Sequence, residues 1–92
     1  MSADNTVFIG KKPTMNYVLA VVTLFKNGND KVNIKARGKA ISRAVDVALI
    51  TQRRFVTDAT IEDIKIMTEE VPTGDEDLTK VSSIEIIMGR QE

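Results

Sequence analysis

The fold is decided by one stretch, which immediately precedes Gly38: Lys31-Val32-Asn33-Ile34-Lys35-Ala36-Arg37. Polar and apolar side chains alternate along it, and successive side chains of a strand point to opposite faces of a sheet. One face would carry Val32, Ile34 and Ala36 into a core, while the other is mainly basic. We expect residues 31–37 to form a half-buried strand that ends at Gly38.

Helical patterns flank this strand on both sides. The first opens with Pro13, which suits the first position of a helix, and stops at Asn27-Gly28. Its helical spacing involves Met15, Val18, Leu19, Val22 and Phe25. Because this helix is apolar nearly all round, we expect it to be buried on more than one side. Residues 39–55 predict a second helix, with an apolar stripe of Ile41, Ala44, Val45, Ala48 and Leu49.

Three further strands complete the pattern. Residues 6–9 form a β-rich run closed by Gly10, and residues 60–71 and 81–88 flank a turn at residues 72–75. In the last strand, Ile84, Ile86 and Met88 share one face. The order β-α-β-α-β-β predicts a single α+β domain over residues 1–92, with residues 1–5 disordered. It would be a two-layer sandwich of two helices on a four-stranded mixed sheet, with an extended C-terminal hairpin.

The residues that are missing narrow the chemistry. The chain of 92 residues contains no Cys, His or Trp, which excludes thiolate nucleophiles, Cys/His zinc sites and imidazole bases. The acidic stretch at residues 68–79 lacks the spacing of a calcium loop and is typical of a solvated turn. Neither a membrane-spanning run nor a secretory signal is visible. We therefore expect no enzymatic activity, no cofactor, no metal and no membrane association.

Charge is divided along the chain. Residues 1–55 hold ten basic and three acidic residues, whereas residues 56–92 hold three and ten, so the halves carry +7 and −7. This asymmetry indicates either a polyanion-binding face or a random scatter of surface charge. The β-α-β topology brings the start of both helices to one edge of the sheet, where ligands often bind.

Both loops at this edge are basic. Cations near the two helix starts oppose the helix dipole unless an anion is bound: Lys11, Lys12, Arg37, Lys39 and Arg43. Free backbone N–H groups at such starts also suit phosphate. The loops are therefore either a polyanion-binding edge or two ordinary solvated turns, and the pattern favours the first.

Several runs are characteristic of one protein family. They are Val7-Phe8-Ile9-Gly10-Lys11-Lys12-Pro13, Met15-Asn16-Tyr17-Val18-Leu19-Ala20, the segment 34–46, Arg54-Phe55 and Val81-Ser82-Ser83-Ile84-Glu85-Ile86. Over about residues 6–90 the chain resembles the archaeal chromatin proteins of the Alba family. The resemblance implies a homodimer that coats double-stranded DNA and can bind RNA, in the cytoplasm and associated with the chromosome.

The resemblance and the basic loops together give the expected nucleic-acid contacts: Lys11, Lys12, Asn16, Lys35, Arg37, Lys39 and Arg43. Lys39 and Arg43 replace a family Arg and Lys, which keeps the charge but alters the donor geometry. The resemblance implies that Lys11 is the lysine that is acetylated in some members and deacetylated by a sirtuin. It also implies that Phe55 packs dimers against one another along DNA.

The hairpin departs from the family pattern, in which it is usually polar or basic. Its expected tip is acidic and includes Glu69, Glu70, Asp75, Glu76 and Asp77. Repulsion from phosphates would make this protein a weaker or more selective DNA binder. The alternatives are an RNA-binding ribonucleoprotein component and a protein-interaction module that uses the acidic hairpin.

A dimer is also expected from apolar residues that lie off the main stripes. They are Tyr17, Val21, Leu24, Val47, Ile50 and Ile87. One two-layer domain would not cover all of them, and exposed apolar patches mark association surfaces.

Overall fold

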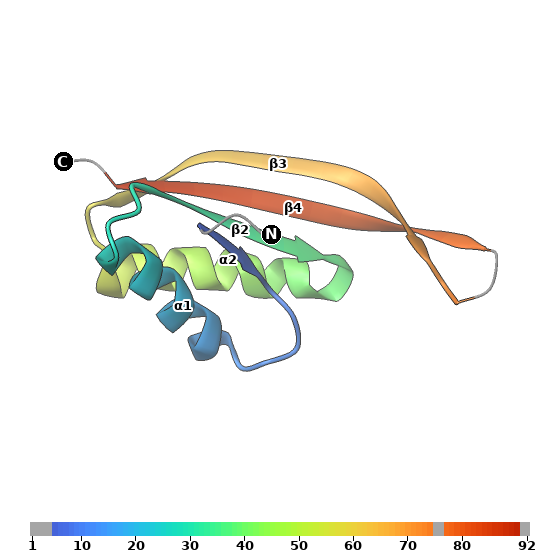
Figure 1. The fold of residues 1–92 in the computed structure, drawn as a ribbon, viewed down its shortest axis with the longest axis horizontal. Helices are drawn as coiled ribbons and strands as arrows, with labels where there is room; N and C mark the ends of the chain where they lie inside the picture. Colours follow the sequence, from blue (N-terminus) through green and yellow to red (C-terminus); the bar gives the residue numbers. More distant parts are fainter. Residues whose placement is uncertain (1–4, 75–76, 91–92) are drawn as a thin grey trace.

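Four strands and two main helices follow one another in the predicted order (Figure 1). The structure is a computed structural model and describes residues 5–74 and 77–90. The strands and helices are β1 (Thr6–Phe8), α1 (Thr14–Lys26), β2 (Lys31–Arg37), α2 (Ile41–Ile50), β3 (Ala59–Pro72) and β4 (Leu78–Arg90). Of residues 1–5, which are predicted to be disordered, residues 1–4 lie outside the described residues. The backbone carbonyl of Asn5 accepts a hydrogen bond from the backbone N–H of Asn33 at 2.8 Å.

The sheet has the strand order β1-β2-β4-β3, and both helices cover the same face of it (Figure 1). β1 pairs with β2 in parallel, and the other two pairs are antiparallel. β2 ends where Arg37 pairs with Ser83, but β3 and β4 continue to pair beyond this point. We call this projecting part, residues 68–74 and 77–82, the hairpin arm. The prediction of a two-layer α+β sandwich on a mixed sheet is confirmed.

The core lies between the helices and the sheet. The predicted inner faces of β2 and β4 are both buried: Val32, Ile34, Ala36, Ile84, Ile86 and Met88. The strict alternation of polar and apolar residues allowed these faces to be predicted from the sequence. A shift of the strand by one residue would turn every one of these side chains to the exposed face.

The helices are rotated relative to the predicted faces. α1 buries Val18, Val21, Val22 and Phe25, whereas Met15 and Leu19 are about half exposed. The prediction that α1 is buried on more than one side is therefore wrong for the single chain. α2 buries Ala44, Val47 and Ala48 and leaves Val45 exposed. When apolar residues surround a helix, more than one stripe satisfies the helical period.

The segment predicted as one helix over residues 39–55 has three parts. A 3₁₀ turn, η1 (Gly38–Ala40), precedes α2, and a π-helical turn, η2 (Thr51–Phe55), follows it. Gly38 has a φ of +54°, which lies in the left-handed region and lets the chain turn sharply from β2 into η1. The backbone N–H of Val56 donates to the carbonyl of Thr51 at 2.8 Å and closes the π-turn. None of the helices in the described parts of the chain is long and apolar enough to cross a membrane.

Candidate nucleic-acid interface

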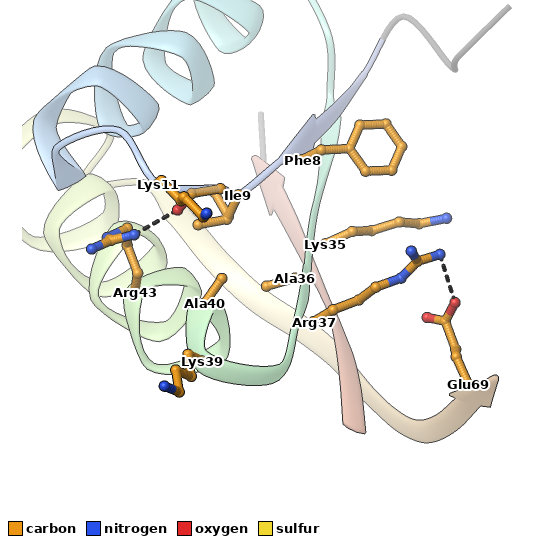
Figure 2. A pocket seen from close by; sticks show the side chains of 11 residues that line it. Phe8, Ile9, Lys11, Lys35, Ala36, Arg37, Lys39, Ala40, Arg43 and Glu69 are labelled. Atoms are coloured by element: carbon orange, nitrogen blue, oxygen red, sulfur yellow. Dashed lines mark hydrogen bonds and ion pairs between the residues drawn. The ribbon is translucent and has the colours of Figure 1, made fainter. Parts of the chain in front are cut away.

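The two loops that lead from a strand into a helix lie side by side at one edge of the sheet. The first runs from Ile9 to Pro13 between β1 and α1, and the second is η1 between β2 and α2. They are joined directly, because the guanidinium of Arg43 in α2 donates a hydrogen bond to the carbonyl oxygen of Gly10 at 2.5 Å (Figure 2). The parallel pairing of β1 and β2 thus produces the shared edge that the topology predicts.

The first loop is shaped by Tyr17. Its hydroxyl oxygen accepts hydrogen bonds from the backbone N–H groups of Gly10 and Lys12, both at 3.0 Å. A Cβ atom at Gly10 would lie only 3.2 Å from this oxygen, so glycine lets the backbone approach closely. The sequence pattern places Tyr17 only among the apolar residues. The role of its hydroxyl could have been predicted only from the general rule that the hydroxyl of a buried tyrosine usually has a hydrogen-bond partner.

A cavity of about 770 Å³ opens at this edge (Figure 2). Its lining includes the buried Ile9 and Ala36, together with Ala40. Phe8 and six charged side chains also line it: Lys11, Lys35, Arg37, Lys39, Arg43 and Glu69. Five of the seven predicted contact residues, all of them cations, are thereby brought together from two loops, β2 and α2.

Two predicted contact residues lie elsewhere. Lys12 is exposed on the first loop, outside the cavity lining. Asn16 lines a separate, open depression with Thr6 and Leu19. Phe55, expected to pack dimers together, ends η2 at the other end of the α2 segment and is about half exposed. It lines a different depression, which also contains Arg90.

Glu69 belongs to this site and not to the tip of the hairpin. It pairs with Val81 in the β-ladder, next to the end of β2, and its Oε1 accepts a hydrogen bond from Nη2 of Arg37 at 2.8 Å (Figure 2). The Ser83 hydroxyl and the Arg37 guanidinium hold the pKa of Glu69 below its usual value. The assignment of Glu69 to the tip is therefore wrong, because the sequence does not reveal where β2 ends along the longer hairpin. Of the other predicted tip residues, Asp75 and Glu76 lie outside the described residues.

The electrostatics of the edge favour an anion. The first turns of α1 and α2, both described throughout, contain no acidic residue, and Glu69 is the single carboxylate among the six charged side chains of the lining. Helix starts flanked by cations attract phosphate through charge and through free N–H groups. In the parts of the chain that the structure describes, no group of three acidic side chains is placed to hold a metal ion. The site is equipped to bind an anion.

Comparisons with known proteins agree with this geometry. The family model described as Alba matches residues 5–68. The DNA/RNA-binding protein Alba of Thermoplasma acidophilum is 57% identical over 90 residues, which cover 98% of this chain and 100% of that protein. DNA/RNA-binding protein Alba 1 of Archaeoglobus fulgidus is 54% identical over 89 residues, with 97% and 99% covered.

A solved structure extends the similarity to three dimensions. Alba from Thermoplasma volcanium superimposes with a TM-score of 0.88 at 57% identity, covering 94% of this chain and 100% of that one. The family model, the relatives and the superposition lead to one conclusion: the chain belongs to the Alba family.

Proposed function

We propose that this protein binds nucleic acid through the edge of the sheet that carries the cation-lined cavity, which we call the basic edge. We also propose that it has no enzymatic activity. The observation that carries the proposal is the convergence of Lys11, Lys35, Arg37, Lys39 and Arg43 on one cavity at two helix starts. Cations in this arrangement neutralise backbone phosphates and hold the protein in register without reading bases. Relatives that are more than half identical carry the name DNA/RNA-binding protein, which supports the same conclusion.

Double-stranded DNA is the proposed principal ligand, with RNA as a second one, in the cytoplasm and on the chromosome. Acetylation of Lys11, reversed by a sirtuin deacetylase, would remove one cation from the rim of the cavity. Lys12 and Asn16 lie outside the cavity. Lys12 is on the same loop as Lys11, and Asn16 is in the first turn of α1, so a long polyanion would pass both.

The test is the salt dependence of binding to a duplex and to a structured RNA of equal length. Lys11→Ala combined with Lys12→Ala should reduce the slope of log K against log salt on DNA by about 0.9 for each phosphate that is no longer neutralised. Arg53→Ala with Arg54→Ala is the matched control, because it removes two adjacent, exposed cations from the far end of the α2 segment. An unchanged slope in the lysine variant would exclude this loop from the interface.

We further propose that the protein acts as a homodimer. The apolar residues from which the sequence predicts a dimer do not support this proposal. Of these apolar residues, Val21 and Val47 are fully buried in the single chain. A different surface supports association. Ile64 and Ile66 in β3 pair with Ile86 and Ile84, so they share the helix side of the sheet, yet they are 53% and 77% exposed.

A dimer would cover this surface. Val45, exposed on α2, adds to the apolar surface on the helix side of the sheet. Ile66→Lys should therefore shift the sedimentation coefficient from dimer to monomer at micromolar concentration. Met67→Lys is the control, because Met67 is about half exposed but points to the opposite face of the sheet. A monomeric wild-type protein would refute the proposed dimer.

A further inference from the structure

Phe8 is a large aromatic residue in an unusual position. The neighbouring Val7 and Ile9 are buried, whereas Phe8 is 60% exposed on the opposite face of β1. It pairs in register with Lys35 of β2, and neighbouring strands lie about 5 Å apart. Figure 2 shows the ring of Phe8 extending away from the helices, beside the side chains of Lys35 and Arg37.

The surroundings of Phe8 are mainly cationic, since Glu69 is the single carboxylate among the six charged side chains of the cavity lining. Phe8, Lys35 and Arg37 line the same cavity, and Lys11 belongs to its lining as well. Phe8 also lies on the sheet face opposite to Ile64 and Ile66, so it is not part of the surface proposed for the dimer. An exposed ring bordered by cations matches a polyanion that also carries flat aromatic groups.

We propose that Phe8 is a stacking platform for an unpaired nucleobase, whose flanking phosphates lie against Lys35 and Arg37. Surfaces that bind single strands combine a basic groove with aromatic side chains on which bases stack. The cavity volume of about 770 Å³ falls within the range of roughly 300–1,000 Å³ that is typical of small-ligand pockets. A base inside a duplex has both faces covered by its neighbours, so only an unpaired base can use the ring.

This inference rests on the proposed nucleic-acid binding and names a further class of substrate for the same edge. A single strand, a loop or a frayed end would make a stacking interaction that an intact duplex cannot make. The interaction does not depend on base identity, because every base has a π-face. It does depend on the presence of a base, and this distinguishes it from phosphate binding.

The experiment compares three fluorescently labelled ligands with the same number of phosphates: a duplex, a thymidine single strand and an abasic single strand. Phe8→Leu keeps the apolar bulk and removes the aromatic ring. Met67→Leu is the control, because Met67 is an exposed apolar residue on the same face of the sheet but outside the cavity lining. We expect Phe8→Leu to weaken binding of the thymidine strand by about fivefold or more. Its affinity for the duplex and the abasic strand should stay within about twofold of the wild type. Thermal unfolding of both variants tests whether the fold is intact.

The outcomes separate the two proposals. Loss of affinity for all three ligands, or for none of them, would overturn the stacking role of Phe8. Equal losses in Phe8→Leu and Met67→Leu on the thymidine strand would overturn it as well. If the wild-type protein shows no salt-dependent binding to any of the ligands, it is the proposed function itself that fails.

Discussion

Replacing Glu69 with Gln should tighten binding to nucleic acid. In the free protein, the Glu69 carboxylate forms an ion pair with the guanidinium of Arg37 at 2.8 Å. A bound phosphate would take the position of this carboxylate. If nucleic acid binds as proposed, the carboxylate therefore competes with phosphate for Arg37. Gln has nearly the same shape as Glu but carries no charge, so the variant leaves Arg37 free to pair with a phosphate.

The size of the effect follows from the geometry. A phosphate and the carboxylate that share one guanidinium lie about 5 Å apart, and the side chain of Arg37 is 61% exposed, so the dielectric constant of water applies. With screening at ordinary ionic strength, removing the repulsion tightens binding about two- to fourfold per protomer. Because one negative charge is removed beside the bound phosphates, the salt slope should also steepen, by at most about 0.9.

Fluorescence anisotropy on a random-sequence duplex at about 50 and 200 mM salt measures both quantities. Glu70→Gln is the control, since Glu70 carries the same charge one residue further on and points to the other face of β3. The improvement should vanish when Arg37→Ala is combined with Glu69→Gln. If Glu69→Gln binds no tighter than the wild type, or no tighter than Glu70→Gln, Glu69 does not compete with phosphate at Arg37.

Four further results are expected. Gly38→Ala should destabilise the fold by about 1–2 kcal/mol in thermal unfolding, because its φ of +54° is strained for a residue with a Cβ. Tyr17→Phe should cost about 1 kcal/mol and weaken duplex binding, since two backbone N–H groups of the first loop would be left without their acceptor. Lys11→Gln, which mimics acetylation, should lower the salt slope of duplex binding by about 0.9, and an unchanged slope would exclude a switch there. The hydrogen bond from Arg90 lowers the pKa of Asp58, so its ion pair stabilises the fold above the usual carboxyl pKa of about 4. This stabilisation is lost as the pH falls through the lowered pKa, so the difference in Tm between wild type and Asp58→Asn should disappear in acid.

The buried faces of the sheet were easier to predict from the sequence than those of the helices. Alternation along residues 31–37 assigns each side chain to one of two faces, and the structure buries Val32, Ile34 and Ala36 as predicted. In α1, by contrast, the predicted stripe contains Leu19 and the buried one contains Val21. Both residues are large and aliphatic, so only packing against the sheet decides which of them faces inward.

The candidate site divides in the same way. The five cations of the cavity were predictable, because parallel strands bring their following loops to one edge. The Glu69–Arg37 ion pair was not, since it depends on the register of a hairpin whose strands extend beyond β2. Tyr17 was missed for another reason: its role depends on the path of a loop, which residue patterns do not describe.

The hairpin arm should be less stable than the rest of the sheet. As far as the ladder is described beyond Ser83, β4 pairs only with β3, and Leu78 near its end is exposed. Isolated two-stranded hairpins are at most marginally stable in water, so this part should open without unfolding the core. Amide hydrogen exchange should then form a gradient along β4, fast near Leu78 and slowest around Ile86. An arm that melts locally can fit the shape of whatever it lies against, and part of the binding energy is then spent on ordering it.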